Sequence, residues 1–440
     1  MTRAMKDSGV EWIGEIPKSW STKKLKFCSN IITGNTPSKS NYDSYYSENG
    51  ILWVKPDDLN DFVPITNTKE KLTKLGSGIA KIVPEETSLI CCIGSIGKLG
   101  FSNQKVAFNQ QINAVCFNTS IVNKKFGFYF LYTQESQHNF YANGNVLKIL
   151  NSENHKRIQI PAPPLPEQQA IADYLDDKCA QIDNITATIN EQIEVLKQYK
   201  KSVITEAVTK GLNPNAPMKD SGVEWIGQIP EKWEIEKIKY ISKLKGRIGW
   251  QGLTSSEYME EGPYLITGTD FIDGKINWKT CTHISNERWE QAAEIKIKNG
   301  DLLITKDGSV GKVAIVDNLT EKASLNSGVL KIILNEKIIQ TKYLFWVLLS
   351  DVFWHWFALK NAGNSTIIHL YQSDFSEFKF ICPTLPEQQA IADYLDDKCA
   401  QIDAVVADKQ AQLETLAAYK KSLIYEYVTG KKSVPGFEEA

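Results

Sequence analysis

The sequence is poor in the residues from which metal centres are usually built. It has only 5 His and 8 Cys in 440 residues, and no two cysteines stand in a Cys-x-x-Cys pair. Structural zinc sites commonly take their ligands from such pairs, so we expect no metal site. Cys179 and Cys399 are expected to be small buried side chains within helices. Cysteines used in this way fit a reducing, cytoplasmic compartment.

Long apolar runs are also missing. Residues 1–6 are polar and no apolar segment follows them, so we expect no signal peptide. The most apolar stretch, residues 343–359, contains Ser350, Asp351 and His355. A stretch with these polar residues predicts a buried helix rather than a membrane span.

What the sequence does contain is a long internal repeat. The 19 residues from Leu165 to Asp183 recur without change from Leu385 to Asp403, at an offset of 220. A second block, Met5 to Gly14, recurs as Met218 to Gly227. These repeats predict two halves built on one plan.

The repeated block after Pro166 is typical of a long helix. Proline suits the first turn of a helix, and the next glycine, Gly211, suits its end. Each helix would run for about 40 residues, or about 60 Å. Apolar residues fall seven apart, which predicts an antiparallel coiled coil of the two copies. The rows are Leu175, Ile182, Ile189, Leu196, Val203 and Leu395, Ile402, Lys409, Leu416, Leu423, where Lys409 either weakens the core or sets the register.

The polar residues of the two helices are identical as well, which a coiled-coil seam does not require. We therefore expect an exposed surface that is used twice, by two copies of one partner. A recent duplication is the alternative, although the segments between the repeats have diverged while the helices have not. The predicted docking residues are Glu167, Gln168, Asp173, Asp176, Asp177, Glu387, Gln388, Asp393, Asp396 and Asp397.

The segments between the repeats, residues 21–164 and 234–384, are each the size of one domain. Both mix short strand-like runs such as Ile51–Val54 with turns, and each has an aromatic helical stretch near its end, at 126–141 and 343–359. The first has 16 Lys and Arg against 10 Asp and Glu, which fits contact with nucleic acid. The second has 18 against 18, and the chain has a net charge of −2. Other subunits would therefore supply basic surface for tight DNA binding.

Two short motifs recur in these diverged segments. Gly94-Ser-Ile-Gly-Lys98 has a counterpart in Gly308-Ser-Val-Gly-Lys312. The motif is either a plain hairpin turn or a phosphate contact through its lysine and serine. Phe108-Asn-Gln-Gln-Ile-Asn113 is matched loosely by Leu325-Asn-Ser-Gly328. Asn and Gln amides pair with adenine in the major groove, whereas turn geometry alone also favours Asn.

With these features the chain resembles the specificity subunits of type I restriction-modification enzymes over essentially its full length. The resemblance rests on both repeated blocks and on Gly34-Asn-Thr-Pro37, Trp53-Val-Lys55 and Lys245-Gly-Arg-Ile-Gly-Trp250. It implies an α+β chain: two globular α/β target-recognition domains joined by two long helices in an antiparallel coiled coil, with a pseudo-two-fold internal repeat. The implied divisions are globules at 1–164 and 212–384, spacer helices at 165–211 and 385–430, and a tail at 431–440.

The resemblance also implies a function. Each globule would read one half of a bipartite, asymmetric site in double-stranded DNA, and the helices would set the spacer and dock two methyltransferase subunits. S-adenosylmethionine, ATP and magnesium would be bound by those subunits and by motor/nuclease subunits, and no cofactor by this chain. The implied DNA contacts are Thr36, Lys55, Ser95, Lys98, Asn109, Gln110, Gln111, Arg247, Trp250, Lys306, Ser309, Lys312 and Asn326.

Two other classes of function compete with this one, an enzyme and a protein-binding scaffold. An amino-methyltransferase needs an Asn/Asp-Pro-Pro-aromatic tetrapeptide, which is missing, and residues 213–217 do not fit it. Pro56-Asp-Asp58 with Glu70-Lys71 lacks the residue that metal nucleases place between acid and lysine. We therefore expect no active site in this chain. A coiled-coil scaffold that binds proteins without DNA specificity is compatible with the composition.

Overall fold

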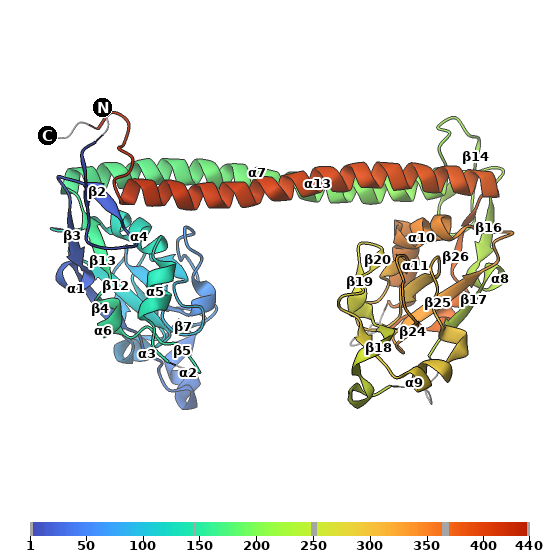
Figure 1. Cartoon of the computed structure of the whole chain (residues 1–440), viewed down its shortest axis with the longest axis horizontal. Helices are drawn as coiled ribbons and strands as arrows, with labels where there is room; N and C mark the ends of the chain where they lie inside the picture. The colour runs from blue at the N-terminus through green and yellow to red at the C-terminus, as the bar shows by residue number, and fades with distance from the viewer. Residues whose placement is uncertain (1–2, 145, 248–252, 363–368, 438–440) are drawn as a thin grey trace. The chain divides into compact units, whose positions relative to one another are not determined.

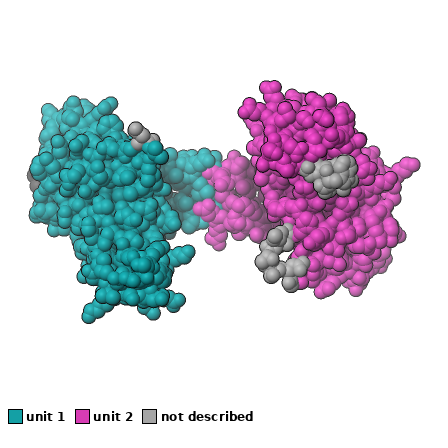
Figure 2. Space-filling model, turned by 90° about the horizontal axis from the view of Figure 1, so that it is seen from below, with its two compact units in different colours: residues 1–189, 411–440 teal, residues 190–410 magenta. Residues whose placement is uncertain are grey.

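The chain folds into two compact units, which Figure 2 shows in different colours. Unit 1 comprises residues 1–189 and 411–440, and unit 2 comprises residues 190–410. Each unit therefore contains a globule and parts of both long helices. The computed structural model describes residues 3–144, 146–247, 253–362 and 369–437.

The strands of unit 1 form a mixed α/β globule with its short helices (Figure 1). The strands are β1 (Met5–Asp7), β2 (Glu15–Pro17), β3 (Ser21–Lys24), β4 (Ser29–Thr33), β5 (Tyr46–Ser47), β6 (Ile51–Val54), β7 (Lys71–Leu72), β8 (Ile82–Val83), β9 (Ser88–Cys91), β10 (Leu99–Phe101), β11 (Val106–Phe108), β12 (Ile112–Phe117) and β13 (Gln159–Ala162). The helices are α1 (Leu25–Cys28), η1 (Lys39–Asn41), α2 (Tyr42–Tyr45), η2 (Pro56–Asp58), α3 (Lys74–Ile79), α4 (Lys124–Tyr132), α5 (Glu135–Tyr141) and α6 (Ser152–His155).

Two sheets make up most of this globule. One has the antiparallel order β10-β9-β12-β4, and the other has the order β5-β7-β6-β11-β8 with β6 and β11 parallel. Helix α4 packs on the first sheet. All four residues of β9 are buried because this strand lies between β10 and β12, with α4 against it. The strand predicted at Ile51–Val54 is confirmed as β6.

Unit 2 repeats this plan with different sequences. Its strands are β14 (Met218–Asp220), β15 (Gln228–Pro230), β16 (Glu234–Lys237), β17 (Ser242–Gly246), β18 (Met259–Ile266), β19 (Phe271–Ile272), β20 (Lys275–Ile276), β21 (Thr282–His283), β22 (Leu302–Thr305), β23 (Val313–Ile315), β24 (Ala323–Leu325), β25 (Val329–Leu334) and β26 (Lys379–Cys382). Its short helices are α8 (Ile238–Ile241), η4 (Ser255–Glu257), η5 (Gly268–Asp270), α9 (Asn286–Glu290), η6 (Ala293–Ile295), α10 (Thr341–Leu349), α11 (Asp351–Lys360) and α12 (Gln372–Ser376).

The four-stranded sheet of unit 2 matches that of unit 1, and its second sheet has three strands where unit 1 has five. The order β17-β25-β22-β23 is antiparallel, and β21-β18-β24 contains one parallel pair, β18 with β24. Strand β16 pairs with β26 as β3 pairs with β13. The prediction of two α/β globules on one plan is confirmed.

The two predicted long helices are confirmed as α7 (Leu165–Lys210, 46 residues) and α13 (Leu385–Val428, 44 residues). Both are followed closely by a glycine with positive φ, Gly211 at +77° and Gly430 at +71°. A Cβ on Gly211 would meet the ring of Trp233 at 2.9 Å. Glycine is therefore needed here both for the left-handed backbone and for the close approach of the ring.

The two long helices pack antiparallel in each unit. In unit 1, Nζ of Lys420 lies 2.6 Å from Oδ1 of Asp183. In unit 2, Nζ of Lys200 lies 2.6 Å from Oδ2 of Asp403. A contact nearer the end of α7 thus falls nearer the start of α13, as the coiled-coil prediction requires.

The predicted apolar rows are mostly buried. On α7 only Leu196 is half-exposed, and on α13 only Lys409 and Leu416 are. Nζ of Lys409 donates to Oε1 of Gln192 on the facing helix at 2.6 Å. One polar contact in an apolar row favours a single register of the helix pair.

The aromatic stretches near the end of each globule are helical, but each is divided in two. Residues 126–141 span α4 and α5, and residues 343–359 span α10 and α11. Ser350 separates the second pair with an extended backbone at φ −78° and ψ 165°. Within the described residues, none of the helices combines the length and apolar character that a bilayer crossing requires.

Candidate nucleic-acid interface

Most of the predicted DNA contacts of unit 1 lie on loops that follow four strands. Residues 34–37 follow β4, 55–58 follow β6, 92–98 follow β9 and 109–111 follow β11. We call these four segments loop cluster 1. Because β6 and β11 are parallel, their carboxyl ends meet at one edge of the sheet.

Hydrogen bonds join the segments of loop cluster 1. The amide of Asn109 donates to the carbonyl of Val54 at 3.0 Å, and that of Asn35 to the carbonyl of Phe108 at 3.2 Å. The amide of Cys92 donates to the carbonyl of Gln111 at 2.7 Å. The sequence motifs that were identified separately therefore lie side by side and form one continuous surface.

The glycine motif of loop cluster 1, residues 94–98, is a hairpin turn between β9 and β10. A hairpin turn was one of the two interpretations of this motif, and a phosphate contact was the other. Its lysine has a second role, because Nζ of Lys98 donates to the carbonyl of Pro56 at 2.8 Å. Lys98 is half-buried, whereas Ser95 is exposed. The turn thus holds a positive charge against the loop that follows β6.

Polar side chains also cover the loop after β11. Thr36 and Gln110 are both exposed, and the hydroxyl of Thr36 donates to Oε1 of Gln110. Gln111 is half-buried and accepts a hydrogen bond from Nδ2 of Asn109 at 3.0 Å. Gln110 is thus the amide of this motif most accessible to a ligand.

The expected contact of Asn109 with DNA stays a prediction, and in the structure its side chain has a local role. Its side chain is only 6% exposed, and its Oδ1 accepts a hydrogen bond from the amide of Gln111 at 3.1 Å. Asn109 therefore builds the turn on which Gln110 stands, which is the local role that favours Asn in turns.

Lys55, also in loop cluster 1, has its charge already paired. Its Nζ forms an ion pair with Glu70 and lies 4.7 Å from the centre of the Trp53 ring. Burial lowers the pKa of Lys55, and the nearby Lys39 lowers it further. A phosphate at this point would compete with Glu70.

Unit 2 builds the same kind of surface, which we call loop cluster 2. It comprises residues 267–270, 306–312 and 326–328, which follow β18, β22 and β24. Nζ of Lys312 donates to the carbonyl of Gly268 at 3.3 Å, matching the contact of Lys98 with Pro56.

The polar members of loop cluster 2 have unequal exposure. Ser309 and Lys312 are exposed, whereas Lys306 and Asn326 are half-buried. Oδ1 of Asn326 accepts from the amide of Gly328 at 3.2 Å, which is the turn contact that Asn109 makes in unit 1.

The sequence analysis missed residues 267–270 as the counterpart of residues 55–58. In both turns an aspartate caps the backbone: the amide of Lys55 donates to Asp58, and that of Thr267 donates to Asp270, each at 2.8 Å. The one sequence feature that could have revealed this correspondence is an aspartate four residues after the end of a buried strand. The turns at 55–58 and 267–270 share no other residue.

The DNA contact expected at Arg247 stays a prediction, and its side chain is buried against the end of β24. Arg247 is 5% exposed, its Nε donates to the carbonyl of Leu325 at 2.7 Å, and its Nη2 donates to the hydroxyl of Ser324 at 3.0 Å. Its guanidinium therefore holds the end of β24. Trp250, which was expected to contact DNA, lies outside the described residues.

Part of the predicted docking surface on the helices makes contacts within the chain, and the docking role of these residues stays a prediction. Glu167 is 4% exposed, and its carboxylate accepts from Nε1 of Trp20 at 2.9 Å and pairs with Arg3. Gln168 and Gln388 are fully buried, and each donates through Nε2 to a proline carbonyl at 2.8 Å. Glu387 is exposed but accepts from Nε1 of Trp233 at 3.1 Å.

The repeated glutamate and glutamine residues therefore attach each globule to the start of its helix. Asn123 and Gln340, just before α4 and α10, donate their amides to Oε1 of Gln168 and Gln388 at 2.7 and 2.8 Å. The same internal contact in both units accounts for the identity of Gln168 and Gln388.

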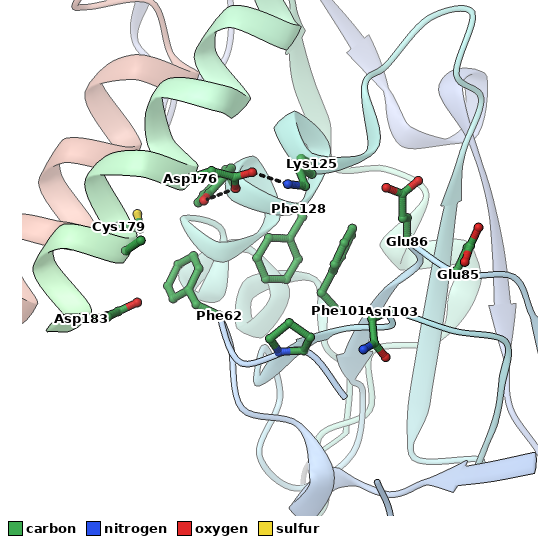
Figure 3. Close-up of a pocket in the computed structure, with 13 residues that line it drawn as sticks. Phe62, Glu85, Glu86, Phe101, Asn103, Lys125, Phe128, Asp176, Cys179 and Asp183 are labelled. Atoms are coloured by element: carbon green, nitrogen blue, oxygen red, sulfur yellow. Dashed lines mark hydrogen bonds and ion pairs between the residues drawn. The ribbon is translucent and has the colours of Figure 1, made fainter. Parts of the chain in front are cut away.

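Asp176 and Asp396 have a similar internal role. Asp176 accepts from the hydroxyl of Tyr129 at 2.7 Å and pairs with Lys125, and Asp396 accepts from Nε1 of Trp346 at 3.0 Å. Figure 3 shows Asp176 pointing toward Lys125 at a groove of about 520 Å³ in unit 1. The remaining predicted docking residues, Asp173, Asp177, Asp393 and Asp397, are exposed on the helices.

The described residues hold no group of three or more His, Cys, Asp and Glu side chains placed to bind a metal ion. The eight cysteines all lie within the described residues and none forms a disulfide. Burial raises the pKa of the Cys179 and Cys399 thiols to about 11, so both are protonated at neutral pH.

Comparisons with known proteins agree with this two-fold plan. The sequence profile of the type I restriction modification DNA specificity domain matches residues 17–195 and 230–415. The chain is 26% identical over 429 residues to the type I restriction enzyme MjaVIII specificity subunit of Methanocaldococcus jannaschii, covering 94% of this chain and 93% of that protein. It is 25% identical over 332 residues to the type I restriction enzyme EcoBI specificity subunit of Escherichia coli, covering 74% and 69%. A solved structure from work on complex assembly and conformational transition of the type I R-M system has the same fold, at TM-score 0.70 and 16% identity over 95% of this chain and 99% of its own.

Proposed function

This chain belongs to the type I restriction-modification DNA specificity family, and on that premise we propose that it is the DNA-reading subunit of such a complex. Each unit reads one half of a bipartite site in double-stranded DNA. The long helices set the number of base pairs between the halves.

The observation that carries this proposal is the pair of loop clusters. Both follow equivalent strand ends and share the lysine contact and the capped turn. Their outward residues differ: Gln110-Gln111 in unit 1 stands where unit 2 has Ser327-Gly328. One scaffold with two sets of side chains is what an asymmetric DNA target requires, because hydrogen-bonding groups at the base edges determine sequence preference.

The helices support the spacer role. A continuous helix of 46 residues extends for about 69 Å at 1.5 Å per residue. Each helix belongs partly to unit 1 and partly to unit 2, and the antiparallel partner stiffens it. Helix length then determines the gap in the DNA target.

Catalysis is assigned to partner subunits. Two methyltransferase subunits, which bind S-adenosylmethionine, dock on the helices, where Asp173, Asp177 and their repeats Asp393 and Asp397 are exposed. Motor/nuclease subunits supply ATP- and magnesium-dependent cleavage. The net charge of −2 favours such a complex, because basic surface on the partners compensates for the weak electrostatic attraction of this chain to DNA. Eight free cysteines fit a location in the cytoplasm.

Replacing residues 21–164 by the equivalent globule of a relative tests the proposal. The complex with its methyltransferase subunits is expressed in cells, and the methylated sites are read by sequencing. The expected result is a methylated motif in which one half-site changes and the other is retained. Methylation without any sequence preference in the wild-type complex would favour the scaffold function instead.

A further inference from the structure

A groove lies at the carboxyl-terminal end of α7 in unit 2. It has a volume of about 870 Å³, and Tyr199, Ala207 and Tyr394 line its apolar side. Tyr394 is 40% exposed and Tyr199 is 48% exposed. Glu206 lies at the same groove with its carboxylate largely in solvent. Exposed aromatic walls beside an acidic group are unusual for a surface that stays bare.

The internal repeat shows what occupies the equivalent position in unit 1. At the offset of 220, Tyr394 corresponds to Tyr174, and Ala207 corresponds to Tyr427. Tyr427 is 5% exposed, and its ring centre lies 4.7 Å from that of Tyr174. In unit 1 an aromatic ring therefore covers the tyrosine that unit 2 leaves open.

The acidic residue is also covered in unit 1. Glu426, the counterpart of Glu206, lies 2.8 Å from Nζ of Lys432 in the tail after α13. Val434 of the same tail packs against the core of unit 1. At this position the chain thus places a ring against Tyr174 and a cation on Glu426.

Unit 2 has no aromatic ring at its own position, where Ala207 is 3% exposed, and the apolar side chains of Leu212, Pro214 and Met218 line the groove beside it. Alanine replaces the ring, and the chain after Gly211 continues as Leu212-Asn213-Pro214. Glu206 has only an ion pair at 3.4 Å with Lys210 of the same helix, and both side chains are about 60% exposed. The groove therefore keeps an aromatic wall and an acidic rim.

We propose that this groove binds a segment of a partner protein that packs an aromatic ring against Tyr394 and places a basic side chain on Glu206. The charge of Glu206 and the ring that unit 1 places beside Tyr174 define this chemistry. This inference rests on the proposed function, in which the partner is one methyltransferase subunit. Aromatic side chains inserted in such pockets dominate the affinity of many interfaces.

One consequence is that the two docking positions are not equivalent. Tyr427 closes the position in unit 1, so only a partner bound at unit 2 can insert its ring. Two identical partners would then bind with unequal affinity, although the helix residues around them repeat exactly as Leu165–Asp183 and Leu385–Asp403.

The test uses the full chain with Ala207→Tyr, mixed with purified methyltransferase subunit and titrated by calorimetry. The variant should lose affinity at one of the two positions by at least about tenfold. Ala207→Ser, which leaves the groove open, should bind as the wild type does. Because a tyrosine already stands at the equivalent position 427, Ala207→Tyr should fold, and its unfolding temperature checks this.

Tyr394→Ala gives an independent test, since it removes the wall and should weaken the same position. Wild-type affinity at both positions for Ala207→Tyr and Tyr394→Ala would overturn the groove proposal. Methylation by the wild-type complex separates this failure from failure of the proposed function. If the wild type methylates a specific motif while the variants bind normally, only the groove proposal is wrong. If the wild type binds no methyltransferase subunit, both are wrong.

Discussion

Nε1 of Trp20 donates a hydrogen bond to the carboxylate of Glu167 at 2.9 Å, joining the start of the first globule to the start of α7. Trp233 and Glu387 form the equivalent bond at 3.1 Å in unit 2. Two glutamates of the repeat that were predicted to dock a partner thus attach each globule to its helix.

Replacing Glu167 by alanine should destabilise unit 1. The change leaves Nε1 of Trp20 without its acceptor in a buried position, which costs about 1–3 kcal/mol. Glu387→Ala should cost less because Glu387 is exposed. Denaturant unfolding of both variants measures the difference, and equal losses would contradict this account of the attachment.

Acid should destabilise unit 1 through two buried histidines. The rings of His138 and His155 are fully buried with centres 5.1 Å apart, and none of their four nitrogens has a hydrogen-bond partner among the described residues. Burial lowers the pKa of His138 to about 3, and burial together with His138 lowers that of His155 well below 6.5.

Because both pKa values are depressed, the unfolded chain binds more protons than the folded chain below pH 6.5. The contribution of the two neutral histidines to the free energy of unfolding is therefore fully present above pH 6.5. It falls as the pH decreases, by about 2–3 kcal/mol at pH 5.5 for the pair. Calorimetric unfolding from pH 7.5 to 5.5 measures this loss. The double variant His138→Phe/His155→Phe should lose less stability, because phenylalanine binds no proton. It should also fold, because Phe375 fills the position equivalent to His155 in unit 2. The same pH dependence in wild type and variant would contradict the assignment.

The lysines of the two glycine turns should contribute equally to DNA binding. Lys98→Ala or Lys312→Ala should weaken binding by roughly tenfold on every sequence and reduce the salt dependence by about one counterion. Lys105→Ala is the matched control, because Lys105 precedes β11 at the opposite end of that strand from loop cluster 1. Binding is measured on the assembled complex over a range of salt concentrations. An effect of Lys105→Ala as large as that of Lys98→Ala would indicate a diffuse charge effect.

Gln110 and Asn109 are adjacent but should behave differently. Gln110→Ala should relax sequence preference in the first half-site by about 1–3 kcal/mol without changing stability. Asn109→Ala should instead lower stability by about 1 kcal/mol, since its side chain holds the turn. Methylation-site sequencing and thermal unfolding distinguish the two roles. A loss of stability in Gln110→Ala would place this residue in the turn as well.

The long helices and the two-fold plan could be predicted from the sequence because both depend on repetition. An identical block of 19 residues and an apolar row with a spacing of seven need no knowledge of tertiary contacts. The rows were right at Leu175 and Leu395, which are fully buried. The polar exception at Lys409 also has a partner, Gln192.

The roles of single polar residues could not be predicted in the same way. Helical spacing does not tell which face of α7 the globule covers, so the sequence alone does not reveal that Glu167 is buried. Arg247 follows a strand as a DNA-contacting residue would, but its guanidinium turns to the carbonyl of Leu325. The turn at Thr267–Asp270 shares only its aspartate with the turn in unit 1, which is too little for recognition from the sequence.

The central claim is that the helix pair sets the gap in the DNA target, and a deletion of matched segments tests it most directly. Residues 190–196 and 406–412 lie between the ion pairs Asp183–Lys420 and Lys200–Asp403 on the two helices. Removing both takes seven residues, or about 10 Å, from each helix and keeps the spacing of the apolar row. Methylation-site sequencing of cells carrying the shortened chain should find both half-sites retained and the gap reduced by about three base pairs, at about 3.4 Å per pair. An unchanged gap in a methylated motif would contradict the claim.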